Sequence, residues 1–181
     1  MAGIVKKTGG GNRINRMVKH LKYIGFRSRE VEKHERGFFD EKYEKGVDYK
    51  SFVKSVKDNK SLKHPSTNKY HKFVFSLSSW EYKNSNRDYK DIIRSTIARY
   101  EKERNVKLNW IGSFHEAEKH PHCHVVISGA SRKLPDATYK RIYFNKDDFK
   151  ELRQNFQMEV DRDKTMTFVQ NQNYRDEYLY S

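Results

Sequence analysis

The sequence predicts an α+β fold in which helices pack against an antiparallel sheet to form a sandwich. Segments with apolar residues at helical spacing alternate along the chain with segments in which every second residue is apolar. Two of the predicted strands are separated by only six residues, which favours a hairpin and therefore antiparallel pairing. With 181 residues, we expect a single domain over residues 1–181, with a flexible tail after about residue 165.

The N-terminal segment predicts one edge strand and one amphipathic helix. Residues 3–6 form a short apolar run that suits an edge strand, and the glycines at 9–11 are expected to be a flexible connection. From residue 12 to about residue 26, apolar residues recur at helical spacing and form one buried stripe: Ile14, Met17, Val18, Leu21 and Ile24. The opposite face carries Arg16, Lys19, His20 and Tyr23. Tyr23 should therefore point away from the core.

The remainder alternates strands and helices. Strands are predicted at residues 72–78, 108–115, 122–128 and 141–144. A short helix is expected around residues 49–57. Ser85 and Asp88 resemble a capping box that opens a longer helix, and Asn145 can cap a final amphipathic helix built on Phe149, Leu152, Phe156 and Val160.

The composition indicates a polyanionic partner. The 38 lysines and arginines exceed the 24 aspartates and glutamates, giving a formal charge of +14, which favours nucleic acid. The 12 tyrosines and 11 phenylalanines are interleaved with these cations, as expected for a surface that contacts phosphates and stacks on bases. Composition alone fits a ribosomal or general RNA-binding protein equally well. The single cysteine, Cys123, and the lack of an apolar leader or spanning run predict a cytoplasmic protein without membrane insertion.

Four of the eight histidines, His115, His120, His122 and His124, fall within ten residues. Side chains alternate along a strand, so His122 and His124 project from the same face. If the intervening loop closes a hairpin, His115 lies opposite His122, where Cβ atoms are about 4.5 to 5.5 Å apart. Three converging imidazoles suit a divalent cation with positions open for substrate or water. The alternative is a solvated or hydrogen-bonded cluster without metal.

The loop between the two histidine strands supplies further candidates. His120 is expected to contact DNA or to support the metal ligands, and Glu116 and Glu118 could hold imidazole N–H groups or complete the coordination. Three nitrogen ligands favour manganese, zinc, nickel or cobalt over magnesium on intrinsic affinity. We expect manganese first, with the other four ions as alternatives.

The segment H-E-A-E-K-H-P-H-C-H-V-V-I, at 115–127, resembles the three-histidine motif of the HUH endonucleases, and its proline is typical of mobilisation relaxases. The strand K-F-V-F-S-L-S, the long helix before the histidines and F-K-E-L-R-Q-N-F after them recur in that order in such relaxases. R-M-V-K-H-L-K-Y-I-G-F-R resembles their first motif, whose nucleophilic tyrosine maps onto Tyr23. The resemblance covers roughly residues 12–160. It implies the HUH nuclease (relaxase, palm-like) sandwich, with the histidine triad on two adjacent central strands.

The resemblance implies a relaxase that nicks single-stranded DNA at a plasmid origin of transfer. Tyr23 would attack a backbone phosphate, leaving a 5′-phosphotyrosyl link and a free 3′-hydroxyl, and the reverse reaction would religate the strand. The metal would polarise the phosphate. A tyrosine with a pKa near 10 needs roughly 4 kcal/mol to ionise at neutral pH, so His20 or Glu30 is a candidate proton acceptor. The residues expected to hold DNA are Arg16, Lys19, Arg27, Arg29 and His120.

The resemblance also implies a monomer that works with accessory relaxosome proteins and a type IV secretion coupling protein. Two alternatives stay open. A rolling-circle replication initiator or transposase of the HUH class would place its tyrosines after the histidines, and Tyr174 and Tyr178 have the spacing of such a pair. A non-catalytic nucleic-acid-binding protein would use the histidines for a structural metal.

Overall fold

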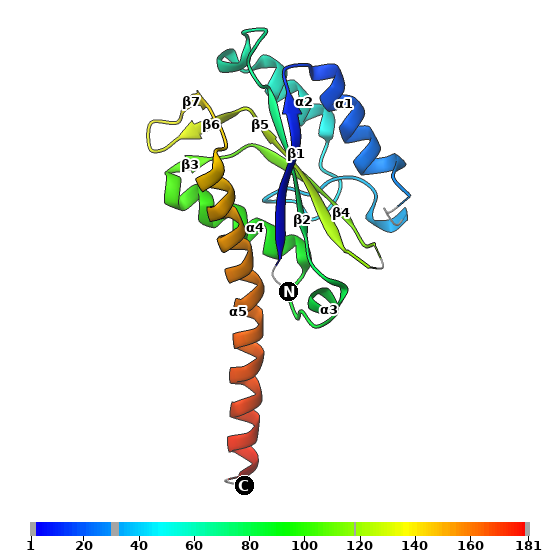
Figure 1. Ribbon diagram of the computed structural model, residues 1–181, viewed down its shortest axis with the longest axis vertical. Coiled ribbons are helices and arrows are strands. Elements are labelled where there is room, and N and C mark those ends of the chain that lie inside the picture. Colours follow the sequence, from blue (N-terminus) through cyan, green and yellow to red (C-terminus); the bar gives the residue numbers. More distant parts are fainter. Residues whose placement is uncertain (1–2, 30–32, 118, 180–181) are drawn as a thin grey trace.

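The computed structural model describes residues 3–29, 33–117 and 119–179, with side chains as far as Arg162. Its centre is an antiparallel sheet of four strands, and a three-stranded antiparallel sheet lies beside it (Figure 1). The larger sheet has the order β1 (Ile4–Gly11), β2 (Tyr70–Ser76), β5 (His122–Ser128) and β4 (Trp110–His115). The smaller sheet has the order β3 (Val106–Lys107), β6 (Ala130–Lys133) and β7 (Thr138–Arg141). The predicted α+β fold with antiparallel sheets is confirmed.

Helices cover both faces of the larger sheet (Figure 1). On one face lie α1 (Ile14–Lys22) and α2 (Tyr49–Asp58), and on the other lie α4 (Tyr89–Arg104) and α5 (Lys146–Leu179). Each face of the larger sheet carries its own hydrophobic core. Side chains alternate along β5, so Cys123 and Val125 pack with α4 and α5 whereas Val126 packs with α1 and α2. His122 and His124 share the side of Val126, so the histidines belong to the face that α1 covers.

The predicted N-terminal helix is present but changes its geometry at Tyr23. Of the predicted stripe, Met17, Leu21 and Ile24 are buried. The α-helical part ends at Lys22, and a single π-helical turn, η1 (Tyr23–Arg27), follows it. In this turn the Ser28 amide donates to the Tyr23 carbonyl, five residues back, rather than to the carbonyl four residues back.

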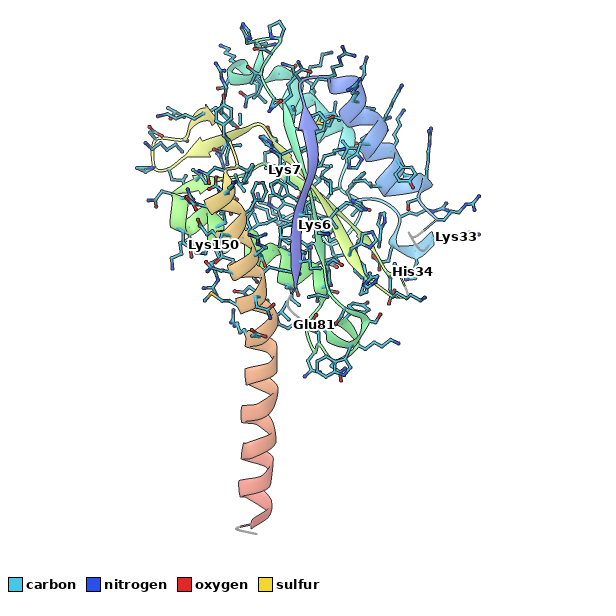
Figure 2. The ribbon with its side chains drawn as sticks, viewed as in Figure 1. Lys6, Lys7, Lys33, His34, Glu81 and Lys150 are labelled. Atoms are coloured by element: carbon cyan, nitrogen blue, oxygen red, sulfur yellow. The ribbon has the colours of Figure 1, made fainter. Side chains whose placement is uncertain are left out.

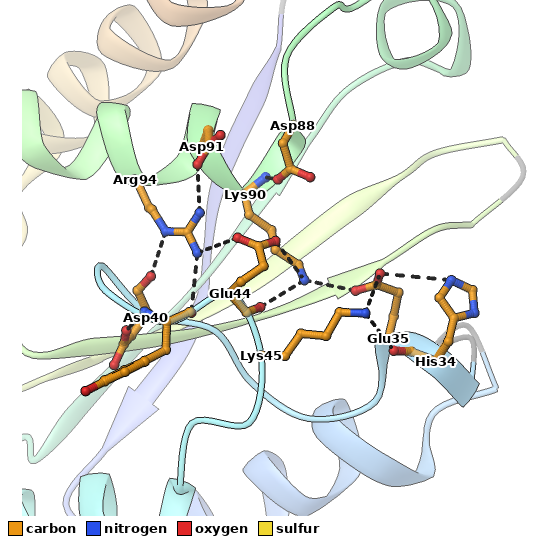
Figure 3. A network of polar contacts seen from close by, with 10 residues as sticks. His34, Glu35, Asp40, Glu44, Lys45, Asp88, Lys90, Asp91 and Arg94 are labelled. Carbon is orange, nitrogen blue, oxygen red and sulfur yellow. Dashed lines mark hydrogen bonds and ion pairs between the residues drawn. The ribbon is translucent and has the colours of Figure 1, made fainter.

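A long connection between η1 and α2 is anchored to α4 by ion pairs (Figure 3). It contains one 3₁₀ turn, η2 (Lys33–Glu35). The Lys90 ammonium lies 2.9 Å from a Glu35 carboxylate oxygen and 3.4 Å from one of Glu44. Further along the connection, Phe39 forms a β-bridge with Gly112 of β4. The connection therefore covers the outer edge of the strand that carries His115.

Two further elements complete the chain. A 3₁₀ turn, η3 (Lys60–Leu62), precedes β2, and a short helix, α3 (Ser79–Lys83), follows it. The α3 helix was not predicted. It opens with a capping box in which the Ser78 hydroxyl accepts from the Glu81 amide and the Glu81 carboxylate accepts from the Ser78 amide.

Several predicted boundaries were wrong. The three glycines belong to β1, because their backbone pairs with β2. Gly10 is needed there, since a Cβ atom would lie 2.5 Å from the Tyr70 carbonyl oxygen. The cap of α4 is Asp88, whose side chain accepts from the Lys90 amide, and not Ser85. The strand expected at 141–144 lies at Thr138–Arg141. Flexibility after residue 165 stays a prediction.

Candidate metal centre

Three histidines from two paired strands converge on one point. His115 of β4 lies directly opposite His122 of β5, as the hairpin prediction required. The ring centroid of His115 lies 5.1 Å from that of His122 and 4.6 Å from that of His124, and the last two are 5.0 Å apart. One nitrogen from each ring lies within 4.8 Å of the others, a spacing that a bound cation can bridge. The strands are adjacent, although β4 is the last strand of its sheet and not a central one.

Backbone carbonyl groups orient two of these imidazoles. His115 Nε2 lies 2.8 Å from the carbonyl oxygen of Ile24, and His122 Nδ1 lies 2.8 Å from that of His120. A carbonyl only accepts, so each of these nitrogens carries the proton. The lone pair is then on Nδ1 of His115 and on Nε2 of His122. Neutral imidazoles held in this way are the donor set that a divalent transition metal prefers, so the residues fit the metal that the sequence predicted.

The π-helical turn makes the Ile24 carbonyl available. In an α-helix the Ser28 amide would donate to Ile24, but here it donates to Tyr23 at 2.9 Å. The Ile24 carbonyl instead accepts from Ser113 Oγ at 2.9 Å and from His115. Ser113 and His115 are both completely buried. The turn that follows α1 thus fixes the strand and one candidate ligand together.

Two histidines of this face, His124 and His20, are kept neutral by their surroundings. Burial, with smaller effects from His115, His122, His20 and Lys72, lowers the pKa of His124 to about 3. Burial, then the positive charge of Lys72 and the proximity of His115, lowers the pKa of His20 to about 4. Both rings therefore carry an available lone pair at neutral pH.

Helix α1 brings His20 to the triad. The His20 ring lies edge-on to that of His124, with the ring centroids 6.1 Å apart. Tyr23 points away from the core, as predicted, and 57% of it is exposed. The two predicted catalytic side chains therefore differ in environment: the imidazole lies against the triad, whereas the phenol faces outward at the start of the π turn.

The elements around the triad contain no acidic residue. Strands β1, β2, β4 and β5, helix α1 and turn η1 hold none of the chain's 24 aspartates and glutamates. Figure 2 shows Lys6 and Lys7 on β1. The lysines and arginines of these elements are Lys6, Lys7, Arg16, Lys19, Lys22, Arg27 and Lys72. Lys6 pairs with Val74 and therefore shares the face of His124, whereas Lys7 pairs with Phe73 and projects from the opposite face. A cation bound by three uncharged ligand nitrogens would keep its full charge, so the histidine face suits an anion.

Other predicted residues have different surroundings. Arg16, Lys19, Arg27, Arg29 and His120 are exposed or lie at the surface, where an anion could reach them. Glu116 accepts a hydrogen bond from the Tyr82 hydroxyl at 3.0 Å, so it ties the hairpin to α3 instead of holding an imidazole. Glu30, Glu118 and the side chains of Tyr174 and Tyr178 lie outside the described residues.

Two contributors were missed by the sequence analysis. The carbonyl of Ile24 supports His115, but a backbone atom has no residue signature. Lys72 lies on the same face of the sheet as His124, because Val74 pairs with His124 and Lys72 is two residues before Val74. Only the pairing of β2 with β5 brings this face of β2 to the histidines.

Comparison with models of known protein families and with curated protein sequences gives no match. Solved structures with a similar fold do exist. The MobM relaxase domain (MOBV; Mob_Pre), bound to 26 nucleotides of pMV158 oriT DNA, aligns with a TM-score of 0.54 at 10% identity, over 90% of this chain and 87% of that one. The conjugative relaxase TrwC, in complex with a mutant oriT DNA, aligns with a TM-score of 0.49 at 14% identity, over 92% of this chain and 69% of that one. The alignment with the MobM relaxase domain shows that this chain shares the fold of that domain. No helix in the described part of the chain has the length and apolar character needed to span a membrane.

Proposed function

We propose that this protein is a metal-dependent relaxase that nicks single-stranded DNA at a plasmid origin of transfer and can rejoin it. The observation that carries the proposal is the convergence of three imidazoles from β4 and β5, with His20 of α1 against them. The strands of the larger sheet, α1 and η1 contain lysines and arginines but no aspartate or glutamate, which suits a phosphodiester. The fold shared with the MobM relaxase domain supports the same conclusion.

His115, His122 and His124 would hold the cation, with manganese the first expectation. When bound, it would polarise the scissile phosphate and stabilise the negative charge that develops there. The protein contributes the rest of the chemistry. The Ile24 and His120 carbonyls fix the orientation of two ligand rings, and exposed cations of α1 and η1 would hold the phosphates on either side of the attacked one.

Tyr23 is the first candidate nucleophile. Its phenol oxygen would form a bond to phosphorus while the bond from phosphorus to the 3′-oxygen breaks, and the 3′-oxygen would leave as a hydroxyl. The neutral imidazole of His20, one helical turn earlier, would accept the phenol proton. The product link is a 5′-phosphotyrosyl ester, which the released 3′-hydroxyl could attack to restore the strand.

The position of His20 favours a second candidate nucleophile. Its ring lies against His124, whereas Tyr23 is mostly exposed. Imidazole forms covalent intermediates in other enzymes, and its neutral form carries the attacking lone pair. In this version a nitrogen of His20 bonds to phosphorus, the 3′-oxygen leaves as before, and a 5′-phosphoramidate forms. Tyr23 would then contact the DNA without attacking it.

A covalent-adduct assay tests the proposal and separates the two nucleophiles. The protein is incubated with Mn²⁺ and labelled single-stranded DNA that contains the origin region of its own plasmid, and is then run on a denaturing gel. A metal-dependent adduct that resists acid and is lost in Tyr23→Phe supports the tyrosine. An adduct that acid hydrolyses, present in Tyr23→Phe and absent in His20→Gln, supports the histidine. If no adduct forms with the cognate origin, the proposed function is wrong.

The same assay addresses the remaining alternatives. Loss of the adduct only in Tyr174→Phe or Tyr178→Phe would indicate a rolling-circle initiator or transposase. Salt-sensitive DNA binding without any adduct, unchanged in Tyr23→Phe and His20→Gln, would indicate a non-catalytic binding protein.

A further inference from the structure

Lys72 lies on β2, between β5, which carries His122 and His124, and the edge strand β1. On one side it pairs with Val126 of β5, and on the other with Gly9 of β1. A Cβ atom built on Gly9 would lie 3.0 Å from Lys72 Cε and 3.4 Å from Lys72 Nζ. The lysine side chain therefore runs over the bare backbone of β1. Lys72 is two residues before Val74, which pairs with His124, so the lysine side chain and that ring lie on the same face of the sheet.

This ammonium group has no acidic partner among the residues that the structure describes. Lys72 is only partly exposed, and it makes no ion pair with any residue that the structure describes. Strands β1, β2 and β5 and helix α1, which surround it, contain no aspartate or glutamate. The positive charge of Lys72 is therefore available to a bound anion.

Gly9 provides the space for this group. The register of β1 against β2 shifts between Lys7 and Gly9, and Gly9 has a φ of +145°, which other residues rarely adopt. Any side chain at this position would crowd the lysine. The glycine run, predicted to be a flexible connection, is therefore a paired strand segment, and Gly9 leaves the space beside Lys72 open.

We propose that Lys72 binds a phosphate of the DNA strand beside the metal centre, over the bare backbone of Gly9. The proposal rests on the proposed function for the identity of the strand. The site combines one ammonium group, the nearby imidazoles of His20 and His124, and surrounding strands and helix α1 that hold no aspartate or glutamate. It thus offers donors and positive charge to an anion. A phosphate next to the attacked one, held here, would fix the path of the strand past His20 and His124.

The first test measures DNA binding without metal. Binding of a labelled oligothymidylate of about 12 nucleotides is followed by fluorescence anisotropy in EDTA at several salt concentrations. Lys72→Met should weaken binding about tenfold and reduce the slope of log affinity against log salt by about 0.7. Lys72→Arg should retain most of both. Lys102→Met, with the same charge change on the exposed surface of α4, is the matched control and should change the affinity much less.

The second test separates a phosphate contact from a structural role. Manganese affinity is measured by calorimetry without DNA. Removing a positive charge near His124 should leave manganese binding unchanged or make it tighter, whereas damage to the strand would weaken it. The expected pattern is thus weaker DNA binding with undiminished metal binding. Thermal unfolding shows whether Lys72→Met is folded, and Lys72→Gln serves as the second variant if it is not.

Equal effects of Lys72→Met and Lys102→Met on DNA affinity and salt slope would overturn the proposal. So would a parallel loss of manganese and DNA binding in both Lys72→Met and Lys72→Gln. Neither comparison depends on strand cleavage. If Lys72→Met weakens DNA binding as expected but the wild-type protein forms no covalent adduct with its origin DNA, the phosphate site is supported and the proposed nicking activity is wrong.

Discussion

His115 Nε2 lies 2.8 Å from the carbonyl oxygen of Ile24, so a turn near the N-terminus holds a candidate metal ligand about 90 residues later in the chain. The same oxygen accepts from Ser113 Oγ. Because the π turn frees this carbonyl, the conformation of residues 23–27 and the orientation of the His115 ring depend on each other. Changes in this turn should therefore be detected at the metal centre.

Ser113→Ala tests this arrangement. The variant loses one of the two hydrogen bonds to the Ile24 carbonyl, while His115 still satisfies that buried oxygen. We expect the free energy of unfolding to fall by about 1 kcal/mol and manganese affinity to fall by less than about threefold. Urea unfolding and calorimetry measure the two quantities. A loss of manganese binding comparable to that of His115→Ala would show that the hydroxyl, and not the carbonyl, fixes the ligand.

His122→Ala and His120→Ala should differ sharply in metal binding. His122 supplies a ligand nitrogen, so its loss should lower manganese affinity by on the order of 100-fold. His120 supports His122 through its backbone carbonyl, which alanine retains, so His120→Ala should stay within about threefold of wild type. Calorimetric titration with Mn²⁺ gives both values. Similar losses in the two variants would mean that the His120 side chain is itself a ligand.

His71 should make the protein sensitive to mild acid. Burial, and then the positive charge of Lys7, lower the pKa of His71 to about 4, against the effect of its hydrogen bond with the Ile142 carbonyl. An unfolded histidine titrates near 6.5, so between about pH 6.5 and 4 the unfolded chain binds a proton that the folded chain does not. Stability present at neutral pH is therefore lost as the pH falls through this window.

From pH 7 to pH 5 the loss due to His71 should be about 2 kcal/mol. Urea unfolding of the metal-free protein at both pH values measures it. His71→Asn keeps a donor near Ile142 but does not titrate, so its stability should fall less between the two pH values. Equal losses in variant and wild type would assign the sensitivity to other groups.

Lys90→Met should release the connection that covers β4. Lys90 is 6% exposed and pairs with Glu35 and Glu44, so its loss leaves a poorly solvated Glu35 carboxylate. We expect a destabilisation of roughly 3 kcal/mol, part of which Glu35→Gln should recover in the double variant. Lys54→Met breaks an exposed pair with Asp58, which solvent screens, and should cost much less. Thermal and urea unfolding measure the stability of the single variants and of the double variant. If Lys90→Met and Lys54→Met cost the same, the buried ion pairs of Lys90 do not hold the connection.

Gly10→Ala and Gly11→Ala test the close approach of β1 to β2. A Cβ atom on Gly10 would lie 2.5 Å from the Tyr70 carbonyl oxygen, whereas the nearest atom to one on Gly11 is 3.6 Å away. The Gly10 variant should lose about 1–3 kcal/mol of stability, and the Gly11 variant no more than about 1 kcal/mol. If both tolerate alanine, the strand can move outward and the glycine at position 10 is not required.

The sequence predicts best what short segments determine. His115, His122 and His124 lie within ten residues, and strand alternation with a short loop is enough to bring them together. The buried side of α1 and the outward direction of Tyr23 follow in the same way from helical spacing.

Features that depend on the order of strands in the sheet or on backbone conformation could not be predicted from local sequence patterns. The run at 9–11 has no side chains to alternate, so its strand is visible only through pairing with β2. Lys72 becomes part of the histidine face only because β2 lies beside β5, about 50 residues later in the chain. Ser85 and Asp88 are both good caps, and composition does not decide between them. The support of His115 by Ile24 depends on a π turn that residue types do not specify.

Cys123 lies between His122 and His124 in sequence but projects into the opposite core, where it is completely buried. It is the only cysteine of the chain, and burial raises its pKa well above the ordinary value of a thiol. A thiol reagent can therefore modify it only while β5 is separated from α4 and α5. The rate of modification would report the opening of the strand that carries the triad, and slower modification in the presence of manganese or DNA would give the kinetic protection that each ligand confers on the fold.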